Sequence, residues 1–236
     1  MKPSARHAFI IALRDLGELW HERATMIVCA IFTFAFPSYL GWMAATIHLN
    51  PTHVLIWALD CSMMPIFPAA MMMVHTFIAE RDQGILPTLL ATPVSNLALF
   101  TGKAVPIIML GISQGLGAYA TYCLTIYFRN REVILAADRV GLIVLPLMLV
   151  CTTLLVSGAG IIIASRVRAI RTAALALTFC SLFILSAEFG VALWLMLDPL
   201  GHELALDAII SHTCLGVATL TVAANTYRRE QIVAQL

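Results

Sequence analysis

Six apolar stretches, each long enough to cross a lipid bilayer, follow one another along this chain of 236 residues. A membrane-spanning helix needs roughly 20 predominantly apolar residues, and the backbone inside lipid must satisfy its own hydrogen bonds. The pattern therefore predicts an all-α integral membrane protein with six transmembrane helices. The predicted spans cover residues 24–46, 54–79, 104–128, 140–164, 172–197 and 208–226.

The composition excludes the main soluble classes of protein. Charged residues make up 11% of the chain and hydrophobic residues 61%, whereas a soluble domain carries about 25% charged residues. We therefore expect membrane lipid around the chain and no nucleic-acid partner. Because six spans use most of the length, residues 1–236 form one transmembrane domain. Any ATP-hydrolysing domain must then come from another chain.

The distribution of Lys and Arg predicts the orientation of the spans. With the amino terminus in the cytoplasm, eleven of the fourteen basic residues fall on the cytoplasmic side. This excess agrees with the positive-inside rule, so we expect both termini to be cytoplasmic. The three basic residues on the outer side are Arg129, Arg131 and Arg139.

The segment before the first span, residues 4–23, has the pattern of an amphipathic helix. Phe9, Leu13, Leu16 and Trp20 follow helical spacing and form one apolar stripe. Charged residues occupy the other side. The pattern predicts a helix that lies in the inner membrane interface and connects to the first span.

A cytoplasmic segment of about 24 residues, 80–103, carries the most specific motif in the chain. Its sequence is ERDQGILPTLLATPVSNLALFTGK. This resembles the type-2 ABC transporter permease family, in which E-R-x-x-G-T-L-x-x-L-x-x-(T/S)-P-(V/L)-(S/R) leads to G-K at the third span. Here Ile85 replaces the usual Thr, and Pro87 lies inside the expected short helix.

The resemblance implies the membrane subunit of an ABC exporter with a type V-like fold. The segment 80–103 would then contain the coupling helix that docks on an ATPase subunit, because apolar anchors on a short helix fit a groove on a partner. The chain has no G-x-x-x-x-G-K-[ST] motif of its own. The residues that the resemblance assigns to ATPase coupling are Glu80, Arg81, Gly84, Leu86, Leu89, Leu90, Pro93 and Lys103.

The implied assembly contains two ATPase subunits and a second permease copy, identical or related. ATP and Mg would bind the partner ATPase, and this chain would bind no cofactor. Its six cysteines lie in separate apolar stretches, which predicts neither a zinc site nor a disulfide framework. The expected location is the bacterial plasma (inner) membrane.

Glu80 is similar to a family residue that pairs with basic residues of the connecting helix. Arg14 and Arg23 are the partners available in this chain. Such a pair would tie the connecting helix to the coupling segment. The alternative is a solvated Glu80 that only caps its span.

Two acidic residues, Asp60 and Glu188, fall inside predicted spans. A charge inside the membrane costs about 2.5–3.5 kcal/mol on insertion scales and is a functional hypothesis by default. Pro65 and Pro68 follow Asp60 and could break the helix there. Asp60 and Glu188 are therefore candidates for lining the translocation path, with protonated or paired acids near the outer interface as the alternative.

Two other function classes fit parts of the sequence. Gly111-Ile112-Ser113-Gln114-Gly115 matches G-x-S-x-G, so Ser113 and His212 could serve as nucleophile and base of a six-span intramembrane serine protease. That motif normally sits on a strand–turn–helix, which is absent from this pattern. A membrane assembly factor that transports nothing is the third alternative.

Overall fold

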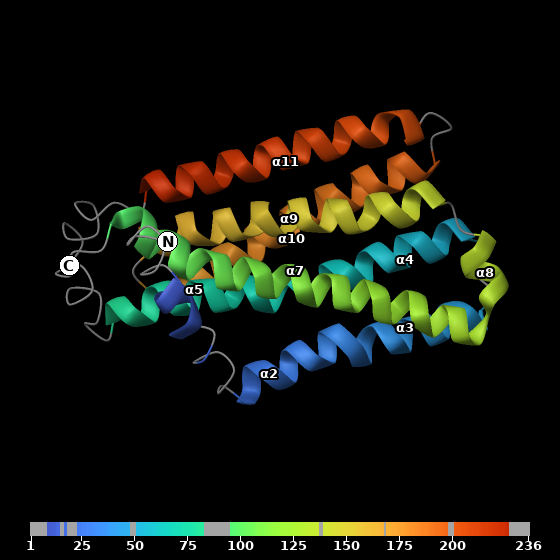
Figure 1. Ribbon diagram of the computed structural model, residues 1–236, viewed down its shortest axis with the longest axis horizontal. Helices are drawn as coiled ribbons and strands as arrows, with labels where there is room; N and C mark the ends of the chain where they lie inside the picture. The colour runs from blue at the N-terminus through green and yellow to red at the C-terminus, as the bar shows by residue number, and fades with distance from the viewer. Residues whose placement is uncertain are drawn as a thin grey trace.

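The computed structural model is a bundle of helices that run along a common long axis (Figure 1). It describes residues 9–14, 17, 23–47, 51–82, 95–136, 139–167, 169–197 and 201–226. Within these residues, five helical segments are long and apolar enough to cross a membrane. For this part of the chain, the prediction of an all-helical fold with several helices apolar enough to span a membrane is confirmed. The five segments are Arg23–Thr46, His53–Met72, Leu97–Arg129, Leu142–Arg166 and Ile209–Thr226.

The first span contains a wide turn. It runs through α2 (Arg23–Ala30), the π-helix η1 (Ile31–Ala35) and α3 (Phe36–Thr46). Inside η1, the N–H of Phe36 donates to the carbonyl of Ile31, five residues earlier. Pro37 has no N–H to give to the carbonyl of Thr33 and its ring crowds that carbonyl, which favours widening of the preceding turn.

The second span is broken at the position where the prolines predicted a break. Helix α4 (Pro51–Met63) ends before a turn at Met64 and Pro65, and α5 (Ile66–Asp82) continues the span. Pro65 has no N–H, so the carbonyl of Cys61 loses its usual helical donor. The chain therefore crosses as two helical segments.

The helix that contains the third predicted span begins before that span. Helix α7 (Asn96–Arg129) starts eight residues before position 104, because the Ser95 hydroxyl accepts a hydrogen bond from the N–H of Ala98 at 3.2 Å. A serine in this position satisfies one of the free N–H groups of a helix start. The last part of the expected coupling segment, Asn96 to Lys103, is therefore helical.

The remaining helices complete the bundle. A short helix, α8 (Arg131–Ala136), follows α7, and the Arg131 guanidinium lies 5.5 Å from the centre of the Tyr127 ring. Three long helices follow. The apolar segment described within the second of them is Arg171–Ala187, which is shorter than a full span, so the span expected over residues 172–197 remains a prediction. These helices are α9 (Arg139–Arg166), α10 (Ile170–Leu197) and α11 (Gly201–Thr226).

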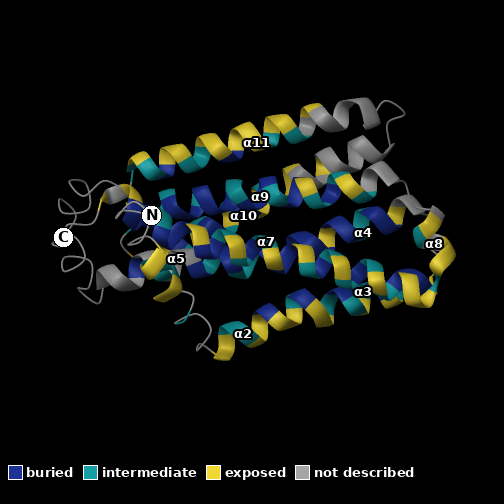
Figure 2. Cartoon of the chain, viewed as in Figure 1, coloured by how far each residue is buried: buried dark blue, intermediate teal, exposed yellow. Residues whose placement is uncertain are grey.

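The core lies between α4, α5, α7 and α9, and the first and last spans are peripheral (Figure 2). In the most apolar 18 residues of each segment, 61% of the residues are buried in the three middle spans, but only 22% in the first span and 11% in the last. Exposed apolar side chains cover the outer faces of α2, α3 and α11. Such apolar faces are more stable in contact with lipid tails than with water.

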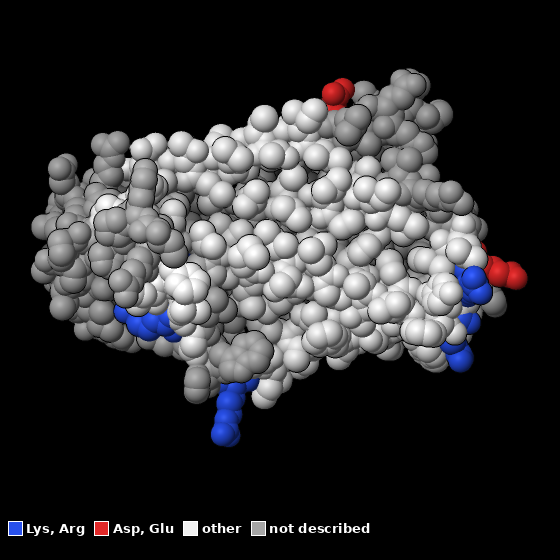
Figure 3. Space-filling view, viewed as in Figure 1, with Lys and Arg blue, Asp and Glu red and all other residues white. Residues whose placement is uncertain are grey.

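On the face in Figure 3, the Lys, Arg, Asp and Glu side chains lie at the margins of the bundle and surround a broad uncharged area. Arg129, Arg131 and Glu132 lie at the end that contains α8. The opposite end contains the end of α5, the start of α7 and the end of α11 (Figure 1). This arrangement is typical of a chain that crosses a bilayer, and the cytoplasmic termini remain a prediction.

The described part of the expected interfacial helix is short. Residues 9–14 are helical, with Ile11 packed against the core and Phe9 and Leu13 exposed. Leu16 and Trp20 lie outside the described residues. An interfacial position for residues 4–23 therefore remains a prediction.

Candidate functional site

Asp60 lies in the last turn of α4, directly before the break of the second span. Its side chain is exposed, whereas the next three residues, Cys61, Ser62 and Met63, are buried. The N–H of Met64 donates to the carbonyl of Asp60 at 3.3 Å, and the N–H of Phe67 donates to the carbonyl of Met64 at 3.3 Å. Asp60 is therefore an exposed residue beside a break in the helix.

The position of Asp60 along the span bears on what its side chain can contact. It is the tenth residue of α4, so it lies about 14 Å from the start of that helix at 1.5 Å per residue. The hydrocarbon core of a bilayer is about 30 Å thick. If α4 and α5 cross the membrane, Asp60 lies near its middle, where contact of a charge with lipid tails costs about 2.5–3.5 kcal/mol.

Glu188 belongs to α10, which packs against α4 and α5. Its side chain lies outside the described residues, so the distance between the two acids is not fixed. Of the two acids proposed to line the path, Asp60 is the one whose exposure is described.

The segment expected to dock on an ATPase falls mostly outside the described residues. Glu80 and Arg81 belong to the last turn of α5, but their side chains are not described, and Gly84, Leu86, Leu89, Leu90 and Pro93 lie between the described parts. The structure does place the end of α5 and the start of α7 at the same end of the bundle (Figure 1). The pairing of Glu80 with Arg14 or Arg23 is likewise outside what it describes.

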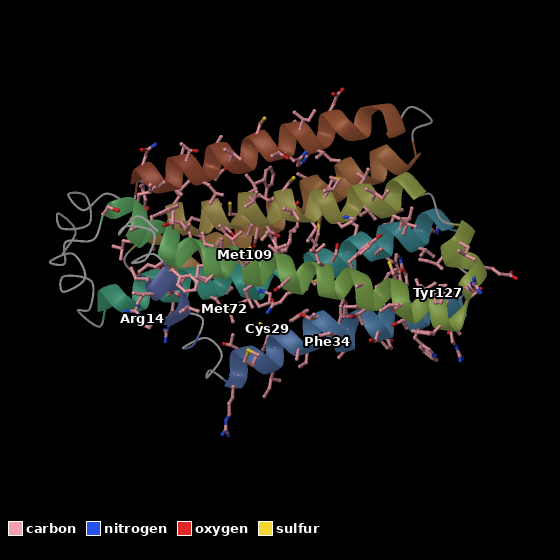
Figure 4. All side chains as sticks on the ribbon, in the orientation of Figure 1. Arg14, Cys29, Phe34, Met72, Met109 and Tyr127 are labelled. Carbon is pink, nitrogen blue, oxygen red and sulfur yellow. The ribbon has the colours of Figure 1, made fainter. Side chains whose placement is uncertain are left out.

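Of the residues assigned to ATPase coupling, Lys103 has a described side chain. It lies in α7 and is 0% exposed, among the largest fully buried side chains of the described residues. Its role in coupling stays a prediction. By contrast, Arg14 and Arg23 are exposed, and Figure 4 labels Arg14.

The structure does not bring together the residues of the protease alternative. Ser113 is exposed on α7, and its hydroxyl donates to the carbonyl of Leu110 in the same helix at 2.9 Å. His212 lies on α11, which packs on α9 and α10, whereas α7 packs on α3, α4, α5 and α9. Nδ1 of His212 is 3.5 Å from Oγ of the adjacent Ser211.

Glycines in the spans act as contact points within the chain. A Cβ on Gly115 would lie 2.6 Å from Cδ1 of Leu149, and one on Gly158 would lie 2.8 Å from Cγ2 of Thr219. These distances are shorter than van der Waals contact. The glycines therefore let α7 approach α9, and α9 approach α11, as small residues commonly do between membrane helices.

Sequence reasoning missed a buried polar contact between the first span and α7. Thr33 in η1 and Gln114 in α7 are both buried, and the Gln114 side chain interacts with the Cys29 thiol. Cys29, labelled in Figure 4, lies one helical turn before Thr33. The signal in the sequence was Pro37, which lies four residues after Thr33 and disturbs the helical hydrogen bond to the Thr33 carbonyl.

Comparison with models of known protein families and with curated proteins gave no match for this chain.

Proposed function

We propose that this chain is the membrane-spanning permease subunit of an ATP-binding-cassette transporter, working as an exporter. The observation that carries the proposal is the motif of residues 80–103, from Glu80-Arg81 through Thr92-Pro93 to Gly102-Lys103. Five apolar helices long enough to span a membrane support it. The short outer connections, which have no room for a docked substrate-binding protein, favour export.

In this proposal, energy comes from a separate ATPase. ATP binding closes a pair of ATPase subunits, which move the coupling segments of two permease copies, and the spans reorient between inward and outward access. A symmetric pair of permeases is the commonest arrangement for such oligomers. The assembly would lie in the bacterial inner membrane, with ATP and Mg on the partner.

Helix α5 is well placed to carry this movement. It leads from the coupling segment, through Glu80 and Arg81, to the turn at Met64 and Pro65. A helix transmits force as a rigid element, whereas a break without a continuous hydrogen-bond ladder can bend. Movement of the coupling segment would therefore change the angle at the break, beside Asp60.

Asp60 is then the first candidate for lining the translocation path, with Glu188 as a second. An exposed carboxylate near the middle of the membrane is stable when it faces water, cargo or a polar group of another chain. A path between two permease copies provides such surroundings. A carboxylate on the path favours cationic or hydrogen-bond-donating cargo.

The proposal is tested by co-purification in nanodiscs with the ATP-binding protein encoded next to this chain. The wild-type chain is compared with a Leu86→Ala, Leu89→Ala, Leu90→Ala variant, which removes the predicted apolar anchors. Leu97→Ala is the matched control, because Leu97 is 67% exposed on the first turn of α7 but lies outside the predicted docking helix. We expect a complex with the wild type and the control and none with the triple variant. Failure of the wild type to bind any ATPase would overturn the proposal.

A further inference from the structure

The contact between η1 and α7 contains two buried oxygen atoms that no described residue pairs. Thr33 is 6% exposed and Gln114 is 8% exposed. Oγ1 of Thr33 and Oε1 of Gln114 have no hydrogen-bond partner among the described residues. Buried polar atoms in native proteins are nearly always paired, and ordered water is one of their usual partners.

The two oxygens belong to side chains that meet across one helix contact. A Cβ on Gly117 would lie 2.9 Å from Cγ2 of Thr33, so Thr33 packs directly on α7 at that position. Gln114 lies one turn before Gly117 and interacts with Cys29, which lies one turn before Thr33. Thr33, Gln114 and Cys29 therefore form one polar cluster, shared by two spans.

Thr33 also differs from the other threonines of this interface. The hydroxyl of Thr121 donates to the carbonyl of Gly117 at 2.7 Å, and that of Thr125 donates to the carbonyl of Thr121 at 2.8 Å. Such bonds to the carbonyl four residues back are the usual way for a membrane helix to satisfy a hydroxyl. In the π-helix the backbone register is shifted, and the Thr33 hydroxyl remains available for a ligand.

The chemistry of the cluster selects a small neutral ligand. A threonine hydroxyl both donates and accepts, a glutamine oxygen only accepts, and a thiol does both weakly. All three groups are neutral, so they give an ion little electrostatic stabilisation. Water donates and accepts, and a buried water typically makes about three hydrogen bonds to otherwise unpaired groups.

We propose that Thr33, Gln114 and Cys29 form a binding site for one water molecule, which links the wide turn of the first span to α7. The water accepts from the Thr33 hydroxyl and donates to Oε1 of Gln114, with the Cys29 thiol as its third neighbour. A bridging water tolerates small shifts between its partners. The first span could therefore move slightly against α7 without losing this link. The proposal does not depend on the transport function.

Radiolytic footprinting in ¹⁸O-labelled water tests the proposal on the full chain in nanodiscs. X-rays split bound water into hydroxyl radicals, which oxidise the nearest side chains, and mass spectrometry measures ¹⁸O incorporation at each cysteine. Cys61 and Cys151 are internal controls, because they are 0% and 6% exposed, similar to Cys29 at 4%. We expect Cys29 to incorporate ¹⁸O severalfold faster than either control. Equal rates at the three cysteines in the wild type would overturn the proposal.

Two variants identify the groups that hold the water. The double variant Thr33→Val, Gln114→Leu should lower labelling of Cys29 to the level of Cys61. Thr46→Val, which changes an exposed threonine at the end of the same span, should leave labelling of Cys29 unchanged. Undiminished labelling of Cys29 in the double variant would contradict the assignment of the water to these residues.

A double-mutant cycle gives an independent readout from thermal unfolding. If Thr33 and Gln114 share one water, either single substitution already removes the bridge. The double variant should therefore unfold at about the same temperature as the less stable of the two single variants. Strictly additive losses would show that the two side chains act separately and would also overturn the proposal.

Discussion

The hydroxyl of Tyr122 donates to the backbone carbonyl of Val54 at 3.0 Å, which joins α7 to the first turn of α4. Both residues are fully buried. The bond crosses 68 positions of sequence and fixes α7 beside the helix that carries Asp60. It therefore sets the position of the candidate path relative to the core.

Replacing Tyr122 with Phe removes this bond and keeps the ring. We expect the free energy of unfolding to fall by about 1 kcal/mol, the usual net worth of a buried hydrogen bond. Thermal unfolding in detergent measures the change. Tyr127→Phe is the control, because Tyr127 is exposed at the far end of α7. Equal unfolding temperatures for the two variants would contradict a structural role for the Tyr122 bond.

Gly158→Ala should separate α9 from α11. The added Cβ would lie 2.8 Å from Cγ2 of Thr219 and 3.1 Å from the backbone nitrogen of Leu220, which cannot rotate away. Overpacking of this kind destabilises by about 1–3 kcal/mol. Gly190→Ala is the matched control on α10, where a Cβ would meet nothing within 4 Å. That change should be neutral or slightly stabilising, since alanine favours helix over glycine.

Ser95→Ala should loosen the start of α7. The serine oxygen accepts from the N–H of Ala98, and loss of such a cap costs about 1 kcal/mol. Hydrogen exchange at the first amides of α7 should become faster, by a factor of about five for that energy. Thr101→Ala, two turns into the helix, should leave these amides unchanged. Unchanged exchange in the Ser95 variant would contradict the assignment of Ser95 as the cap.

Asp60 should be accessible to water and not to lipid. In a cysteine-free background, Asp60→Cys should react with a charged, membrane-impermeant thiol reagent, because the side chain is exposed beside the α4–α5 break. Phe183→Cys is the control, since Phe183 is 78% exposed on the apolar surface of α10. We expect reaction to be severalfold faster at position 60. Equal, slow labelling at both positions would place Asp60 against lipid and remove it from the path.

The helical spans were predictable because long apolar runs have one stable form in lipid. The break after Asp60 was also predictable, since Pro65 cannot donate a helical hydrogen bond. The helical start at Asn96 was not identified, because Ser95 was interpreted as part of the coupling motif and not as a helix cap. The π-helix before Pro37 was also missed, because a proline inside a helix can be accommodated by a kink, a break or a widened turn.

Contacts between distant residues were the least predictable part. The structure places Gly115, Gly117 and Gly158 against Leu149, Thr33 and Thr219, and nothing in the sequence identified these neighbours. Those pairings depend on how the helices rotate about their axes. The burial of Lys103 depends in the same way on the rotation of α7, which the motif does not specify.

The most direct test of the transport account is the rate of ATP hydrolysis by the partner ATPase, reconstituted with this chain in nanodiscs. The account predicts that the wild-type chain stimulates hydrolysis and that the Leu86→Ala, Leu89→Ala, Leu90→Ala variant does not, while Leu97→Ala behaves as the wild type. Hydrolysis that is the same with the wild type, the triple variant and no chain at all would contradict it.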